Sequence, residues 1–488
     1  MSKEEKKYRA PTLWESLIVI SALILMIVVG FIIFKLPINL MLIASAVVAA
    51  AMSARLGWGW SEMQEAIARN LKKAMPAIFI MYIVGMVVGS FIYSGTIPMI
   101  VYYGLKIINP KFFLPCCFLT CTVLSMATGT SWGSASTAGL ALFGIANGLG
   151  MPIPVTLGAI VAGCVIGDKM SPLSDCCNMA ALGTGSDVYA MIKNMLWTTI
   201  PAAVIALVIY TVYGFTALGD VASANSESVE LILTQLDSIY QWSPLLLIPF
   251  VVIIGGVAMK FSAVPCMIIA SVCAVILGTL CHGFNLVDGV NAMATGFTTA
   301  MINTGVDTAN LSEDVLTLLE RGGISSMFNT VFLVFCAYSY AGIAQDAGFF
   351  DTVFNLFIDK LNDRKSTVIG SVLTGVFFTI VGGSSYIPLF MVGTLFKKQY
   401  LKQNISLLNL SRAAGDTGSM MIAIVPWSTS GTYYTGLFGV SPAVFGLWTI
   451  VPFLCPLIAI FYGITGIGMK MLDPEDAKRQ LAELEAGE

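Results

Sequence analysis

The sequence predicts an all-α polytopic membrane protein of about 10–12 transmembrane helices, arranged as two inverted repeats with broken helices or re-entrant hairpins. The first observation is composition: 57% of the 488 residues are hydrophobic and 11% are charged, with a mean hydropathy of +0.85. Soluble domains carry about a quarter charged residues, so no water-soluble fold could bury this much apolar surface. The second observation is a series of apolar runs of spanning length. The third is that features of the first half recur in the same order in the second.

Each apolar run of about 20 residues is a candidate spanning helix, because that length crosses the hydrocarbon core of a bilayer. The first run is too long for the core of a signal peptide, so we expect a retained helix there. In the first half the candidates lie near residues 13–34, 37–54, 75–93, 111–127, 153–167 and 190–215. In the second half they lie near residues 243–260, 263–281, 325–342, 366–381, 408–425 and 441–468.

Charges outside these runs predict how the chain is threaded through the cell (inner) membrane. Lys and Arg mark cytoplasmic segments, and they place both termini and the loop after the second run inside. The stretch 217–241 carries only acidic charges and is expected outside, so one of the six first-half candidates should be a re-entrant hairpin. The predicted organisation is a cytoplasmic tail (1–12), a first repeat (13–216), an acidic extracytoplasmic linker (217–241), a second inverted repeat (242–468) and a cytoplasmic tail (469–488).

Interrupted helices occur at matching positions of the two halves. A short segment near 97–108 or 349–361 precedes an apolar run that ends in glycine and serine, at 129–134 in the first half and 382–386 in the second. Each break is followed, at a similar distance, by a Gly-Asp pair. Broken helices at corresponding positions of inverted repeats are the sequence pattern of a transport site near the membrane midplane.

Small residues at the breaks leave the backbone amides and carbonyls accessible. The N-termini of half-helices favour an anion, whereas their C-termini and unwound carbonyls favour a cation. The sequence does not decide which end faces the site. The candidate residues at the breaks are Gly129, Thr130, Ser131, Ser134, Ser384 and Ser385.

The segment 165–181 concentrates polar groups directly after an apolar run. Charges at membrane depth are costly and are tolerated where they line a cavity or bind an ion. Hard cations prefer carboxylate, hydroxyl and carbonyl oxygens, and this segment supplies all three. The alternative is an ordinary cytoplasmic loop. The candidate ion- or substrate-binding residues here are Asp168, Ser171, Ser174, Asp175 and Asn178.

The matching segment of the second half, 408–431, holds Arg412 and Asp416 one helical turn apart, so these two side chains can pair. A structural ion pair and a direct ligand role for Asp416 both stay open. Thr417 and Ser428 add hydroxyl oxygens to this candidate site.

These segments resemble NhaC-type sodium/proton antiporters. The similarity rests on Gly-Thr-Ser-Trp-Gly at 129–133, Gly-Asp-Lys-Met-Ser-Pro-Leu-Ser-Asp at 167–175, and looser matches at 410–412 and 416–427, and it is spread over residues 13–468. The resemblance implies an ion-transporter-type fold with inverted repeats, and exchange of Na⁺ against H⁺ or an organic acid. It also implies that Asp168, Asp175 and Asn178 belong to the ion and substrate region, as candidate ligands of Na⁺.

The chain departs from the family pattern at several positions. Cys176 and Cys177 stand where threonines are expected, Gly415 where an acidic residue is usual, and Ser428 where asparagine is usual. Thiols are poor ligands for a hard cation. The departures leave room for a small organic acid or amino acid, moved with Na⁺ as in malate/lactate exchange.

The prediction is therefore a secondary transporter, not an enzyme, that exchanges Na⁺ for H⁺ by alternating access, with Na⁺ as coupling ion and no cofactor. Na⁺-coupled symport or exchange of a small organic anion or amino acid is the alternative, and a passive channel is another. The Gly-x-Ser-x-Gly pattern around Ser131 matches a hydrolase motif, but it follows an apolar helix and the single histidine, His282, lies on a different run.

Partners other than the transported ions follow from the same composition. The lipid bilayer is the expected surroundings, and a net charge of -3 gives no basis for nucleic-acid binding. The Gly163-x-x-x-Gly167 pattern predicts close helix packing within the chain, and a homodimer stays an open alternative.

Overall fold

The computed structural model is all-helical over the part of the chain it describes, which is residues 8–34, 36–107, 109–172, 174–217, 226–259, 261–303, 305–306, 308–358 and 361–486. Parts of the predicted segments lie outside these ranges, namely residues 1–7 and 487–488 of the tails, residues 218–225 of the linker, and residues 108, 173, 260 and 359–360 of segments within the two repeats. Within the described ranges, β structure is limited to an isolated bridge between Ile405 and Met471.

The helices of the first half begin after the N-terminal tail and end before the linker. They are α1 (Leu13–Leu25), α2 (Ile38–Arg55), α3 (Trp60–Tyr93), α4 (Thr96–Ile107), α5 (Pro110–Thr128), α6 (Ser131–Ser134), α7 (Leu140–Gly148), α8 (Ile153–Met170), α9 (Asp175–Thr184) and α10 (Val188–Ala217).

The helices from the linker onward are α12 (Ser226–Ile239), α13 (Ile248–Ala258), α14 (Ala263–His282), α15 (Leu286–Thr295), α16 (Glu313–Leu319), α17 (Phe328–Asp346), α18 (Phe349–Ile358), α19 (Arg364–Gly382), α20 (Tyr386–Lys402), α21 (Leu407–Met421), α22 (Thr429–Phe438), α23 (Pro442–Phe445), α24 (Ile450–Thr465) and α25 (Pro474–Ala486).

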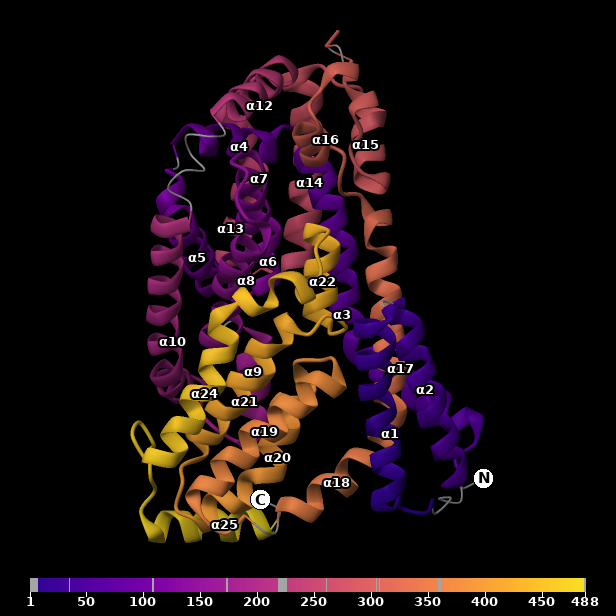
Figure 1. Ribbon diagram of the computed structural model, residues 1–488, viewed down its shortest axis with the longest axis vertical. Coiled ribbons are helices and arrows are strands. Elements are labelled where there is room, and N and C mark those ends of the chain that lie inside the picture. Colours follow the sequence, from indigo (N-terminus) through magenta and orange to yellow (C-terminus); the bar gives the residue numbers. More distant parts are fainter. Residues whose placement is uncertain are drawn as a thin grey trace.

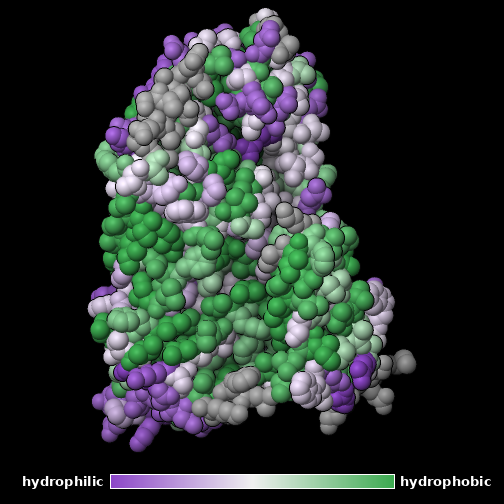
Figure 2. All heavy atoms as spheres, in the orientation of Figure 1, coloured by the Kyte–Doolittle hydropathy of each residue, from purple (hydrophilic) through white to green (hydrophobic). Residues whose placement is uncertain are grey.

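Nine helices in the described ranges are long and apolar enough to cross a membrane, or eleven if each of two bent pairs counts as one span. One bent pair joins α12 to α13 at 101°, and the other joins α23 to α24 at 55°. In Figure 1 the described ends of the chain, before α1 and after α25, lie at one end of the molecule and α12 at the other. Figure 2 shows that hydrophobic side chains fill the middle of the visible face, with polar ones gathered towards both ends.

The predicted inverted repeats correspond to two sets of helix–break–helix elements. In the first half α5 breaks before α6 and α8 breaks before α9; in the second α19 breaks before α20 and α21 before α22. The packing is reciprocal as well, because α3 lies against α14 while its counterpart α17 lies against α2. The third long helix of each half therefore packs against the second long helix of the other half, as expected for two structurally similar repeats.

Local chemistry explains where the breaks fall. α5 ends at Gly129 and α19 at Gly383, both in the left-handed conformation (φ 73° and 60°) that glycine adopts without strain. New helices then start on hydroxyl N-caps: Thr130 accepts from the Gly133 amide, Ser174 from Cys176, and Ser428 from Gly431. Serine and threonine are favoured at this position because their oxygen satisfies an otherwise unpaired amide.

Two expected boundaries differ from the structure. The run expected to begin near residue 75 begins earlier, because α3 starts at Trp60 and continues through Pro76 as one helix. The run expected to end at residue 167 continues as α8 to Met170, which keeps Asp168 and Lys169 helical. The close packing predicted for Gly163 and Gly167 is confirmed, since a Cβ on either would lie 2.4 and 2.2 Å from backbone oxygens of α5.

Candidate functional site

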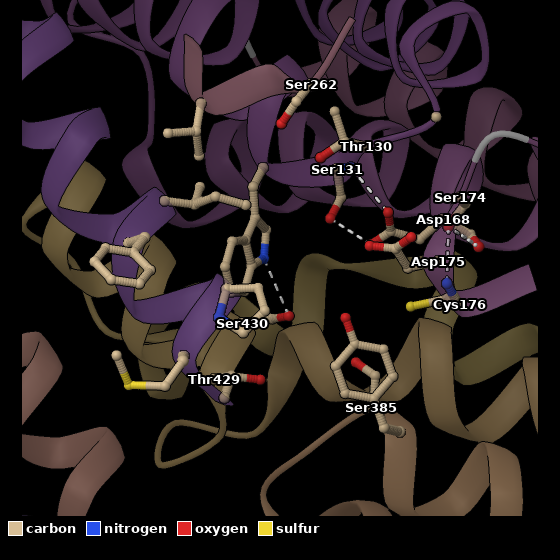
Figure 3. Close-up of a pocket in the computed structure, with 18 of the residues that line it drawn as sticks. Thr130, Ser131, Asp168, Ser174, Asp175, Cys176, Ser262, Ser385, Thr429 and Ser430 are labelled. Carbon is tan, nitrogen blue, oxygen red and sulfur yellow. Dashed lines mark hydrogen bonds between the residues drawn. The ribbon is translucent and has the colours of Figure 1, made fainter. Parts of the chain in front are cut away.

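A cavity of about 850 Å³ lies where the broken helices of the two repeats meet. The first repeat contributes the α5–α6 break, the end of α8 and the start of α9. The second contributes the starts of α20 and α22, and α3, α14 and α17 complete the wall. Figure 3 shows hydroxyl groups and carboxylates pointing into this space from both repeats.

Asp168, in the last turn of α8, is the most highly organised polar group of the cavity wall. Its Oδ1 accepts a hydrogen bond from the Ser131 backbone amide at 3.0 Å, and its Oδ2 accepts one from the Ser131 hydroxyl at 2.5 Å (Figure 3). Its own backbone oxygen accepts from the Ser174 hydroxyl at 2.8 Å. Among the described residues no cation pairs with this carboxylate. Asp168 is therefore held in one orientation, and no described lysine or arginine side chain lies within ion-pair distance of its carboxylate.

Asp175 is the second carboxylate of the cavity. It is the first residue of α9, is exposed, and is labelled beside Asp168 in Figure 3. Cys176 follows it on the wall. Asn178, which was predicted to share a Na⁺ site with the two carboxylates, is not part of this wall, and its amide donates to the Ser174 backbone oxygen at 3.1 Å. Ligation of an ion by Asn178 stays a prediction.

An aromatic stack lies beside the cavity, with its Trp132 side chain on the wall. The Trp132 indole lies parallel to the Tyr433 ring, with centroids 4.7 Å apart and an interplanar angle of 11°. The indole Nε1 donates to the Ser430 hydroxyl at 3.3 Å (Figure 3), and the Tyr433 hydroxyl donates to the Trp132 backbone oxygen at 2.7 Å. This stack joins the break of the first repeat to α22 of the second.

The pairing predicted between Arg412 and Asp416 is wrong. Asp416 Oδ1 instead accepts from the ammonium of Lys169, which lies on α8 in the other repeat, and from the Thr198 hydroxyl at 3.0 Å. Arg412 donates to the Gly468 backbone oxygen at 2.8 Å. Periodicity within one helix reveals neighbours on that helix only, and Lys169 approaches from another.

The remaining candidates divide between the cavity and the helix interior. Gly129, Thr130, Ser131, Ser174 and Ser385 line the cavity together with the two carboxylates. Other candidates serve the backbone: the hydroxyls of Ser134 and Thr417 bond carbonyls of their own helices. Outside the wall of this cavity lie Ser134, Ser171, Ser384, Arg412, Asp416, Thr417 and Ser428.

Several wall residues were not among the candidates. They lie within a predicted break or within two residues of a predicted site residue, which is the sequence feature that could have identified them. Members of this group are Thr128 beside Gly129, Trp132 beside Ser131, Tyr386 beside Ser385, and Ser430 two residues after Ser428. Tyr338 lies on α17 and Ser262 is the N-cap residue of α14, and nothing near them in the sequence indicates the site.

Comparison with known proteins shows what kind of protein carries this cavity. The family model described as Na⁺/H⁺ antiporter family matches residues 163–467, which is more than half of the chain. The chain belongs to the Na⁺/H⁺ antiporter family. The predicted resemblance is thereby confirmed, and the antiporter is a multi-pass membrane protein of a transporter family.

Relatives of the antiporter match it along nearly their whole length. An uncharacterised Na⁺/H⁺ antiporter of Haemophilus influenzae is 35% identical over 472 residues, 96% of this chain and 99% of the relative. The malate-2H⁺/Na⁺-lactate antiporter of Bacillus subtilis is 31% identical over 461 residues, 94% of this chain and 96% of the relative. The Na⁺/H⁺ antiporter NhaC of Alkalihalophilus pseudofirmus is 30% identical over 455 residues, 93% and 96%.

The hydrolase motif around Ser131 has a different role in the antiporter. The Ser131 hydroxyl donates to Asp168. The single histidine, His282, contacts the Ser94 backbone oxygen and the Gln241 amide, both away from the cavity wall. A Ser-His-Asp arrangement needs a histidine within hydrogen-bond reach of the serine.

Proposed function

We propose that this antiporter exchanges Na⁺ for H⁺ by alternating access, and that Asp168 is the group for which the two ions compete. The observation that carries the proposal is the Asp168 carboxylate itself, which faces a large cavity between the repeats, is fixed by two hydrogen bonds from Ser131, and has no cationic partner among the described residues.

The physical argument starts from the cost of an unpaired charge. A carboxylate away from bulk water is unfavourable unless it is neutralised. Either a proton on the carboxylate or a Na⁺ beside it achieves this, and one excludes the other. A transporter that moves the site across the membrane only in a neutralised form would exchange one ion for the other.

The rest of the wall supplies what a Na⁺ ion needs. Hard cations prefer oxygen ligands, and Asp175 together with the hydroxyls of Thr130, Ser131 and Ser174 offers them around the same space. Na⁺ is then the coupling ion, and no cofactor takes part. The basic residues of the two tails assign both termini to the cytoplasm, and the described ends of the chain, before α1 and after α25, lie at one end of the molecule (Figure 1).

The test uses purified protein in liposomes that contain a pH-sensitive dye, with Na⁺ added outside. Wild-type protein should give a Na⁺-dependent pH change, and Asp168→Asn should abolish it while the thermal stability stays near that of wild type. Asp237→Asn, which alters an exposed carboxyl on α12 outside the cavity wall, is the matched control and should transport normally. Normal exchange by folded Asp168→Asn would reject the assignment.

A second candidate function is exchange or symport of a small organic acid or amino acid with Na⁺. The observation that favours it is size, since about 850 Å³ falls in the range of about 300–1,000 Å³ that holds small organic ligands. The wall also carries the aromatic side chains of Trp132, Tyr338 and Tyr386. Thermal stabilisation by one compound from a panel of hydroxy acids, dicarboxylates and amino acids, dependent on Na⁺, would support this function; a panel without effect would contradict it.

A further inference from the structure

The two repeats place their Gly-Asp pairs on equivalent helices, yet the two aspartates have opposite surroundings. Asp168 on α8 faces the cavity and forms no ion pair with any residue that the structure describes. Asp416 on α21 faces Lys169, and both side chains of this pair are fully buried, with 0% of either exposed. The aspartate of the first repeat therefore faces the cavity, whereas the aspartate of the second repeat is paired with the ammonium of Lys169.

The surroundings of the Lys169 ammonium resemble a site for a small monovalent cation. The ammonium donates to Asp416 Oδ1 and to the Thr198 hydroxyl at 3.0 Å, and that hydroxyl also lies 3.0 Å from the same carboxylate oxygen. Cys455 Sγ lies 3.7 Å away on another side. An ammonium is a compact point charge on a flexible stem, so it can take the place of a free ion beside the Asp416 and Thr198 oxygen atoms, with the Cys455 thiol as a more distant neighbour.

An independent observation is that the carboxylate has a ligand oxygen to spare. Asp416 Oδ2 is buried and has no hydrogen-bond partner in the described part of the chain. A buried charged oxygen left unsatisfied costs free energy, so an optimised structural ion pair would be expected to use both oxygens. A site shaped for coordinating an ion can instead leave one oxygen free when a single ammonium replaces that ion.

We propose that the Lys169 ammonium is a tethered cation that fills a second monovalent-cation site at Asp416. On this account the antiporter carries its exchanged ion at Asp168 alone. Asp168 and Lys169 are neighbours in α8, but their side chains point in different directions. The Asp168 side chain lines the cavity, and the Lys169 side chain reaches Asp416 in the other repeat. Removing the Lys169 side chain should therefore open a latent Na⁺ site without touching the first. The inference rests on the proposed function in that it takes Asp168 as the working site.

The experiment measures saturable binding of ²²Na⁺ to purified protein, so it does not depend on transport. Wild type should bind one Na⁺ per chain, and Asp168→Asn should bind none. Adding Lys169→Ala to Asp168→Asn should restore saturable binding, and adding Asp416→Asn to that protein should remove it again. Folded Asp168→Asn/Lys169→Ala protein without Na⁺ binding would overturn the inference, as would a second, Asp416-dependent Na⁺ in wild type.

A second variant covers the case in which an unpaired Asp416 prevents folding. Lys169→Met/Asp416→Leu removes both charges, and replacing a buried ion pair by apolar residues is often neutral or stabilising. This protein should bind one Na⁺ with an affinity within about twofold of wild type, a change well under the tenfold that 1.4 kcal/mol represents. Loss of Na⁺ binding from the folded double variant would mean that the pair itself takes part in ion binding, and would overturn the inference.

The outcomes separate this inference from the proposed function. Persistence of wild-type binding in Asp168→Asn would reject Asp168 as the working site. Loss of binding in Asp168→Asn, without its recovery on Lys169→Ala, would reject the tethered cation and leave the proposed function standing.

Discussion

Removing the Ser131 hydroxyl should weaken the apparent affinity for Na⁺ more than it alters the maximal transport rate. The hydroxyl donates to Asp168 Oδ2 at 2.5 Å, while the Ser131 backbone amide donates to Oδ1 at 3.0 Å. In Ser131→Ala the amide bond stays and the hydroxyl bond is lost. The lost bond stabilises the ionised carboxylate, which is the form that binds Na⁺.

The size of the effect follows from the kind of bond. Hydrogen bonds to charged groups contribute about 1.5–3 kcal/mol, and about 1.4 kcal/mol corresponds to tenfold in an equilibrium constant. Because Asp168 faces a cavity that water can enter, a water molecule can replace part of the lost interaction. We therefore expect the lower end, about a tenfold rise in the Na⁺ concentration that gives half-maximal exchange.

The assay is a Na⁺ titration of the initial pH change in liposomes. Ser136→Ala is the matched control, because the Ser136 hydroxyl bonds the Gly133 backbone oxygen at 3.1 Å and lies outside the cavity wall. The control should keep the wild-type half-maximal concentration. If Ser131→Ala also keeps it, within twofold, the hydroxyl does not prepare Asp168 for Na⁺ and the reasoning is refuted.

Three further predictions concern stability, measured by unfolding in detergent. Gly167→Ala should lower the free energy of unfolding by about 1–3 kcal/mol, because its Cβ would lie 2.2 Å from the Ser125 backbone oxygen. Gly255→Ala is the control and should keep the wild-type stability, because no atom lies within 4 Å of the added Cβ. Equal stability of the two variants would contradict the packing argument. Trp132→Ala should lower the free energy of unfolding by about 0.5–1.5 kcal/mol or more, because it removes the aromatic pair with Tyr433. Trp132→Phe should keep most of the wild-type stability. Lys169→Met should lower the free energy of unfolding by about 3–5 kcal/mol, because it leaves the buried Asp416 carboxylate unpaired. A smaller loss than that of Lys169→Met/Asp416→Leu would contradict a buried ion pair at this position.

Features that depend on local sequence could be predicted from the chain alone. The breaks at Gly129 and Gly383 follow from residues that end and restart helices, and the structure has them where the glycine and serine clusters predicted. Asp168 could be identified as a candidate because a charged carboxylate directly after a long apolar run is energetically unfavourable unless it lines a cavity or binds an ion. Membership of the Na⁺/H⁺ antiporter family, expected from the motifs at 129–133 and 167–175, is likewise confirmed.

Features that depend on contacts between distant segments could not be predicted. The partner of Asp416 lies on another helix, 247 positions away in the sequence, and a pattern within one helix favoured Arg412 instead. The same limit hid Tyr433, which meets Trp132 from the opposite repeat. Hydroxyls were also ambiguous, since Thr130, Ser174 and Ser428 serve as helix caps and a cap uses the same oxygen as an ion ligand.

The reciprocal packing of α3 on α14 and of α17 on α2 bears on the energetics of switching. If the two halves exchange conformations during transport, each contact that breaks in one half is matched by an equivalent contact that forms in the other half. The two end states are then nearly degenerate, and the area removed from lipid and water hardly changes between them. A ligand can shift an equilibrium only by its differential affinity for the two states. Near-degeneracy means that a small preference, such as that of one carboxylate for a proton or a sodium ion, is enough to decide which side of the membrane the molecule faces.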